Sequence, residues 1–289
     1  MKCLLLRCRH LERLWVLIAI ISLLPSSSYA GMLKSVPYAR LPDIPVDQTS
    51  IDLYPCSQTS RTLVVYVHGG GWVGGDKANV YSMPAYFESN NICFASINYP
   101  LQSSGAGTVM NRQLDALLEL GIWISSGGVR SKAFESISIL GHSSGAHLVA
   151  LLDKRFGWSS EISNLILMDS ASYDLEEKYR NSSFRFKRLL EGLLNLNRHH
   201  FDSSRVVLRR FSPALLTPSP RVGDGLNIFI LSGRRAAAKL SAKALLESYA
   251  NASGYNVKTY EYPWRHRDFP RKIGTDTHFN QQFLNFIKP

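Results

Sequence analysis

The stretch that decides the fold is residues 136–152, which read Ser-Ile-Ser-Ile-Leu-Gly-His-Ser-Ser-Gly-Ala-His-Leu-Val-Ala-Leu-Leu. Its first five residues form an apolar run typical of a buried strand, and the pattern from Ala146 onward is typical of a helix. Between them, residues 141–145 match Gly-x-Ser-x-Gly, a sharp strand-to-helix turn that exposes a serine hydroxyl. The pattern therefore predicts that Ser143 is a nucleophile at the edge of a sheet.

The rest of the chain alternates apolar runs with stretches of helical periodicity. The runs that predict buried strands are 62–67, 92–99, 136–140, 164–168, 227–231 and 257–262. Helical spacing relates Leu114, Leu117, Leu118, Gly121 and Ile122, and again Leu240, Ala244, Leu245 and Tyr249. This alternation predicts an α/β fold, with a mostly parallel sheet covered by helices on both faces. Residues 47–53 are expected to add an antiparallel strand.

The longest interruption of this pattern is at about residues 175–222, between two predicted strands. It contains Leu189, Leu190, Leu193 and Leu194 at helical spacing. A structureless loop of this length is uncommon inside a compact domain. We therefore expect a single domain over residues 31–289, with a helical cap inserted at about 175–222.

The first thirty residues differ in character from the rest. Four basic side chains precede an apolar run at 14–24, and Ser-Tyr-Ala follows at 28–30. This order is typical of a secretory signal cleaved after Ala30, and the run is shorter than the roughly 20 residues of a membrane span. The expectation is export to a periplasm or outside the cell, with retention as an uncleaved membrane anchor as the alternative.

The chain is basic, with a formal net charge of +11. Much of this charge lies between Lys178 and Arg210. One interpretation is attraction to a membrane, another anionic surface or an anionic substrate, and the other is a solvated helical face, which we favour. No nucleic-acid-binding motif accompanies the charge, so nucleic acid is not expected as a partner.

Two of the four cysteines, Cys56 and Cys93, lie outside the predicted signal. Cys93 lies within an apolar run, where a buried free thiol is the usual state, so we expect both cysteines to be unpaired although one disulfide would suit an oxidising compartment. Neither a Cys-x-x-Cys motif nor a zinc-like histidine spacing is present, and His199 and His200 are adjacent. No metal or cofactor is expected.

A second motif, His-Gly-Gly-Gly-Trp at 68–72, follows the predicted strand 62–67. Glycines let backbone N–H groups approach a developing oxyanion, so Gly70 and Gly71 are predicted donors, with Ser144 as a third. His68 is expected to hold the loop.

The same loop also satisfies Gly-x-Gly-x-x-G at 69–74, with Glu88 downstream, as in dinucleotide sites. That motif is weak by itself. Because Trp72 lies inside the turn and an independent nucleophile motif surrounds Ser143, we favour the oxyanion interpretation.

Several further motifs belong with these two. They are Gly75-Asp76-Lys77, Asn98-Tyr99-Pro100-Leu101, Asp115, Trp123, and Tyr173-Asp174-Leu175. Together the motifs resemble those of α/β-hydrolase carboxylesterases of the hormone-sensitive-lipase and feruloyl-esterase-like groups, over nearly all of residues 31–289. The resemblance implies an α/β-hydrolase fold. It also implies that His266, in His-Arg-Asp-Phe before the apolar helix 279–287, is the catalytic histidine, with His278 as the spare candidate.

The sequence departs from this family at the catalytic acid. The family carries it shortly after the strand 227–231, where this chain has Ala236 and Ala237. An acid orients the imidazole of a serine hydrolase, and its loss costs roughly 10⁴-fold in kcat. Asp169, at the end of the preceding strand, is the first substitute, Asp174 the second and Asp268 the third.

These residues predict a serine hydrolase that cleaves small-molecule carboxylic esters with short or medium acyl groups through an acyl-enzyme. Ser143 would attack, His266 would carry the proton and Asp169 would orient it. The alternative is a binding protein that kept the fold and lost efficient chemistry, because alanines stand where the acid is usual.

Overall fold

The computed structural model describes residues 34–101, 109–196, 201–221 and 225–287. The predicted export signal and the pair His199-His200 lie outside these ranges. Within them, one eight-stranded sheet forms the centre of the molecule, in the order β1-β2-β4-β3-β5-β6-β7-β8. The alternation of strands and helices predicts such a mostly parallel sheet, and the resemblance to α/β-hydrolases implies the same arrangement.

The strands are short, and most match the predicted runs within one or two residues at each end. They are β1 Lys34–Pro37, β2 Ser50–Leu53, β3 Thr62–Val67, β4 Cys93–Ile97, β5 Ser136–His142, β6 Ile162–Met168, β7 Leu226–Ser232 and β8 Tyr255–Glu261. From β4 to β8 all neighbours are parallel, whereas β1, β2 and β4 pair antiparallel. The antiparallel strand predicted at 47–53 is therefore present, although it begins only at Ser50.

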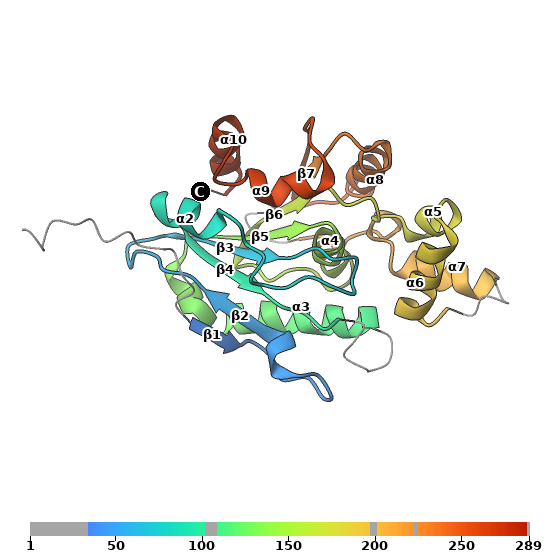
Figure 1. Cartoon of the computed structure of the whole chain (residues 1–289), viewed down its shortest axis with the longest axis horizontal. Helices are drawn as coiled ribbons and strands as arrows, with labels where there is room; N and C mark the ends of the chain where they lie inside the picture. The colour runs from blue at the N-terminus through green and yellow to red at the C-terminus, as the bar shows by residue number, and fades with distance from the viewer. Residues whose placement is uncertain (1–33, 102–108, 197–200, 222–224, 288–289) are drawn as a thin grey trace, which may run out of the picture.

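Helices cover both faces of this sheet. They are α2 Met83–Ser89, α3 Val109–Ser125, α4 Ser144–Phe156, α8 Ala236–Glu247, α9 Phe269–Lys272 and α10 Thr277–Ile287. Alternate residues of β3 show how the faces divide: Leu63 and Val65 pack in the core with α3, α4 and α8, and Val64 packs with α2, α9 and α10. Figure 1 shows α2, α9 and α10 on one side of the sheet and α3 on the other. This period of two is the side-chain alternation of a strand.

Where the structure describes it, the interruption at 175–222 forms the helices α5 Leu175–Arg180, α6 Phe184–Leu194 and α7 Phe201–Arg210, followed by the 3₁₀ turn Pro213–Leu215. Figure 1 shows them grouped at one end of the molecule. Leu190, Leu193 and Leu194 are buried in the main core, so the insertion is anchored on the domain by its leucine face.

Three arginines of the basic stretch form ion pairs within this insertion. Glu176 is buried, and its carboxylate lies 2.8–3.0 Å from the guanidinium groups of Arg180, Arg205 and Arg209. The three arginine side chains are about half exposed. These arginines therefore have a structural role on a solvated helical surface.

Two sequence expectations are wrong. The run 257–262 was expected to be a buried strand, but β8 is an edge strand whose residues are exposed or half-buried, because no described strand pairs with its outer side. Cys56 and Cys93 were expected to be unpaired, but they form a disulfide. The loop after β2 returns to the start of β4, which brings together two cysteines that the sequence separates by 37 residues.

None of the helices in the described ranges has the length and apolarity needed to cross a bilayer.

Candidate active site

Ser143 occupies a strained turn between β5 and α4. Its φ of 57° and ψ of −118° are rare for a residue with a side chain. Its N–H donates to the carbonyl of Met168 at 2.9 Å, which ties the turn to the neighbouring strand β6. A Cβ on Gly145 would lie 2.3 Å from the carbonyl oxygen of Val67, so only glycine lets α4 pack this closely on β3. The turn thus holds the serine at the carboxyl edge of the sheet.

His266 lies beside this serine, at the start of a short 3₁₀ turn between β8 and α9. Its Nε2 is 2.9 Å from Ser143 Oγ, and its Nδ1 is 2.7 Å from Asp169 Oδ2. With the proton on Nδ1, the ring donates to the carboxylate and accepts from the serine hydroxyl. This continuous chain of hydrogen bonds can withdraw the serine proton as the oxygen attacks.

Asp169 follows β6 directly and is buried. Its N–H donates to the carbonyl of Leu231, and its Oδ1 accepts from the N–H of Gly233, both at 2.7 Å. Burial alone would raise the pKa of Asp169, but the bonds from His266 and Gly233 and the charge of Arg235 outweigh it and leave the pKa lowered. Asp169 is therefore a fixed anion that faces the imidazole.

The other acid candidates have structural partners elsewhere. Asp174 caps α5 by accepting from the N–H of Glu177 at 2.9 Å. Asp268 accepts from the N–H of Arg265 at 2.9 Å. His278, the spare histidine, is exposed on α10. Of the three acids considered, the structure places only Asp169 against His266.

Sequence reasoning missed Arg235, which stands just before the two alanines. Its Nη2 donates to Asp169 Oδ2 at 2.7 Å and to the Asp169 carbonyl at 2.8 Å, and it lies 2.8 Å from His266 Nδ1. Directly before the two alanines that stand where the resembled family has its acid, this chain thus has a cation that pairs with Asp169 at the end of the neighbouring strand. Nothing in the sequence around Arg235 distinguishes it from a surface arginine.

His142, immediately before Ser143, was also missed. Its Nε2–H donates to the His266 carbonyl at 2.9 Å, and the two rings lie 4.7 Å apart. Burial, and then the proximity of His266, lower the pKa of His142 to about 3. His142 is therefore neutral at ordinary pH and supports the loop that carries His266.

The glycine loop after β3 lies on the other side of the serine. Gly70 has a φ of 147°, and a Cβ there would lie 1.9 Å from the carbonyl oxygen of Gly74, so the turn admits only glycine. Gly71 and Ser144 line a cavity of about 130 Å³ together with Ser143. Ser144 begins α4, where first-turn N–H groups have no acceptor within the helix. The predicted donors Gly71 and Ser144 therefore border the space in front of the nucleophile, and Gly70 shapes the turn behind it.

His68 lies under this loop. It is buried and stacks on Tyr99 with a centroid distance of 4.4 Å, and burial lowers its pKa. The Tyr99 hydroxyl donates to the His68 carbonyl at 2.9 Å. The expected role of holding the loop matches these contacts.

The dinucleotide interpretation of this loop finds no support in the structure. That motif requires a helix to begin at the glycines, so that its N-terminus can face a pyrophosphate. Here turns follow the glycines, and α2 begins only at Met83. Within the described residues there is also no cluster of three or more metal-ligating side chains.

Comparison with known proteins agrees with this architecture. Residues 51–191 match the BD-FAE family model, from β2 into α6. No curated protein sequence matches the chain.

Solved structures with the same fold include an inhibited esterase B from Lactobacillus rhamnosis, with 17% identity, a TM-score of 0.63, and coverage of 95% of this chain and 94% of that one. A putative thioesterase from Silicibacter sp. has 19% identity and a TM-score of 0.58, over 85% and 81% of the two chains. Thermogutta terrifontis esterase 2, phosphonylated by sarin, has 15% identity and a TM-score of 0.61, over 90% and 97%. The chain therefore has the α/β-hydrolase fold of these structures, and its residues 51–191 are similar to the BD-FAE family.

Proposed function

We propose that the protein hydrolyses carboxylic esters through an acyl-enzyme, with Ser143 as nucleophile, His266 as general base and Asp169 as the residue that orients the imidazole. The observation that carries this proposal is the unbroken hydrogen-bond chain from Asp169 Oδ2 through His266 to Ser143 Oγ. Such a chain activates a hydroxyl that is otherwise a weak nucleophile.

In the first step, Ser143 Oγ attacks the ester carbonyl carbon while its proton passes to His266 Nε2. The negative charge that develops on the carbonyl oxygen is stabilised by N–H groups of Gly71 and Ser144, which border the space in front of Ser143. His266 then protonates the leaving alcohol as the ester C–O bond breaks. Water hydrolyses the acyl-serine by the same route and frees the acid.

The cavity in front of Ser143 supports a preference for short acyl groups. It measures about 130 Å³ and is bounded by Trp72 and Phe186. A space of this size suits an acyl chain of a few carbons.

Export remains part of the proposal. The Cys56–Cys93 disulfide supports it, because disulfides persist in oxidising compartments and are rare in the cytosol.

The experiment is hydrolysis of p-nitrophenyl acetate and butyrate by residues 31–289, beside the Ser143→Ala variant. We expect kcat to fall about 10⁶-fold in the variant, as when the nucleophile of a triad is removed. A fluorophosphonate should label the wild type and leave the variant unlabelled. Equal turnover by the two proteins would rule out Ser143 as the nucleophile.

A second candidate, a binding protein with impaired chemistry, is favoured by one contact. His266 Nδ1 lies within hydrogen-bond distance of both Asp169 Oδ2 and Arg235 Nη2. If Nδ1 accepted from Arg235, the ring proton would be on Nε2, which then could not accept the proton of Ser143. We favour the productive tautomer because an N–H donated to a carboxylate forms the stronger, charge-assisted bond.

Arg235→Met separates these two functions. If the productive tautomer already prevails, the substitution should change kcat on p-nitrophenyl butyrate by less than about tenfold, because Asp169 keeps its bonds to His266 and Gly233. A weakly active wild type that gains a hundredfold or more in the variant would instead show that Arg235 suppresses catalysis.

A further inference from the structure

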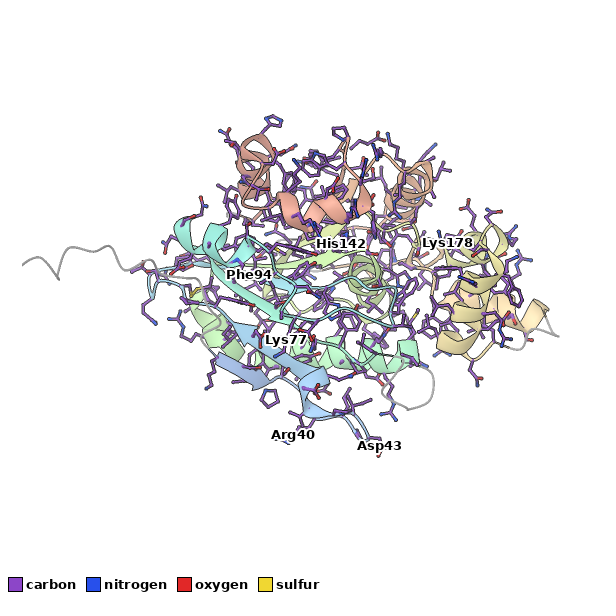
Figure 2. The ribbon with its side chains drawn as sticks, viewed as in Figure 1. Arg40, Asp43, Lys77, Phe94, His142 and Lys178 are labelled. Atoms are coloured by element: carbon purple, nitrogen blue, oxygen red, sulfur yellow. A yellow bond between two sulfur atoms is a disulfide. The ribbon has the colours of Figure 1, made fainter. Side chains whose placement is uncertain are left out.

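The cavity beside Ser143 has positively charged groups in its wall. Lys178 from α5 and Arg235 from the β7–α8 turn both line it, together with Gly71, Ser143 and Ser144. Figure 2 shows Lys178 on the side of the inserted helices nearest the sheet. An ester bound at Ser143 therefore meets two cations within the same small space.

The two cations are close enough to affect each other. The pKa of Lys178 is lowered, first by burial and then by the charge of Arg235. Its Nζ lies 5.2 Å from the centroid of the Phe186 ring, which also borders the cavity. A cation held over an aromatic face is positioned without being neutralised.

Few carboxylates compensate this charge. Among the described residues, no carboxylate forms an ion pair with Lys178. Arg235 pairs with Asp169 through Nη2, while its Nε is buried and has no hydrogen-bond partner in the described part of the chain. Lys178 also lines a neighbouring cavity together with Asp174 and Glu177, but neither carboxylate forms an ion pair with it, and Asp174 is engaged as the cap of α5. The wall beside the serine therefore keeps a net positive charge.

An uncompensated, partly buried ammonium is costly unless a counter-ion reaches it. A substrate that brings its own anion would remove this cost. We propose that the preferred substrates are esters whose short acyl group ends in a carboxylate, which Lys178 binds and the charge of Arg235 attracts while Ser143 attacks the ester carbonyl. This inference rests on the proposed ester hydrolysis and adds its substrate class.

The test compares two esters of matched shape, monoethyl succinate and ethyl 4-methylpentanoate, in which a carboxylate and an isopropyl group occupy the same place. Proton release at constant pH gives kcat/KM for both. Wild type should prefer the succinate ester, and Lys178→Met should lower its kcat/KM about 10- to 100-fold, as expected for a lost charge-assisted hydrogen bond, while changing the neutral ester less than about threefold.

Lys187 supplies the matched control. It belongs to the same insertion, and its Nζ lies 5.5 Å from the centroid of Tyr179, much as Lys178 lies over Phe186, but it does not line the cavity. Lys187→Met should leave the ratio of the two kcat/KM values unchanged. A wild type that prefers the neutral ester, or a Lys178→Met variant that loses both activities equally, would overturn the proposal.

Binding to the Ser143→Ala variant makes the inference independent of turnover. Calorimetry should show monoethyl succinate binding more tightly than the neutral ester, with the difference lost in Ser143→Ala/Lys178→Met. If neither ester is hydrolysed but this preference appears, the proposed function fails and the anion site stands. If a neutral ester is hydrolysed and no preference appears, the reverse holds.

Discussion

The carboxyl edge of the sheet and the helical insertion contribute to the site in different ways. At the edge, Ser143 and Asp169 directly follow strands, and His266 follows the last strand by a few residues. Each makes at least one hydrogen bond to another strand end or loop of that edge. The insertion instead contributes Lys178 from α5 and Phe186 from α6. In the proposals above, the sheet with its strand-end loops, here called the frame, supplies the chemistry, and the insertion at 175–222 selects the substrate.

The largest expected effect is a loss of kcat when the catalytic acid of the frame, Asp169, is replaced. Asp169→Asn should lower kcat on p-nitrophenyl butyrate roughly 10⁴-fold, because an amide neither fixes the imidazole tautomer nor stabilises its cation. The loss should be the same for charged and neutral esters, unlike the loss in Lys178→Met. Steady-state kinetics on both substrates measures it. Asp174→Asn is the matched control, and a similar loss there would contradict the assignment of the acid.

An intermediate effect, on the pH dependence of stability, is expected at His147, which links the frame to the insertion. Trp72 Nε1–H donates to His147 Nδ1 at 3.3 Å, and His147 Nε2–H donates to the carbonyl of Phe211, just after α7, at 3.0 Å. His147 thus serves two partners as a neutral ring. Burial lowers its pKa to about 4.

This lowered pKa makes the joint sensitive to acid. In the unfolded chain His147 is protonated below about pH 6.5, whereas in the folded chain it is protonated only below about pH 4. The free energy of unfolding should therefore fall as the pH drops from 6.5 to 4. The difference between these two pKa values corresponds to a loss of about 3 kcal/mol in the free energy of unfolding. His147→Gln keeps both hydrogen bonds without titrating, and urea unfolding at pH 7.5 and 4.5 should show a smaller loss than in wild type. An unchanged loss would mean that His147 does not contribute.

The smallest effect is expected within the insertion itself. Glu176→Gln removes the charge that gathers Arg180, Arg205 and Arg209, whose exposure limits the loss to roughly 1–2 kcal/mol. Hydrogen exchange should rise in α5 and α7, whereas neutral-ester turnover should stay within about twofold. A large loss of neutral-ester turnover would show that catalysis by the frame depends on the insertion, and would contradict the division of roles between them.

Local sequence patterns were sufficient to predict most of the strands and turns of the frame. The run 136–140 and the glycines at 141 and 145 predict β5 and its turn because strand periodicity and a sharp reversal are properties of neighbouring residues. Of the two antiparallel strands at the start of the sheet, by contrast, only β2 was predicted. β1 was missed since Lys34–Pro37 is short and mostly exposed, with little apolar pattern to detect.

The residues of the site differ in how well the sequence predicts them. Ser143 and the glycine loop carry local motifs, and His266 came from resemblance to a family. Asp169 was one of three candidates, and the choice among them needed the position of β6 beside β7. The pairing of Cys56 with Cys93 was predicted wrongly for a related reason: the burial of Cys93 was correct, but only the path of the chain after β2 brings its partner to it.

The sequence by itself determined the order of strands and helices, the strained serine and the glycine loop, because each depends on periodicity or on the steric needs of a few adjacent residues. The tertiary structure decided which acid faces His266, that Arg235 lies against both, and that Lys178 borders the same cavity. These contacts join residues 31 to 97 positions apart along the chain. No local rule connects such residues, and only the packing of strand ends and inserted helices sets the distances between them.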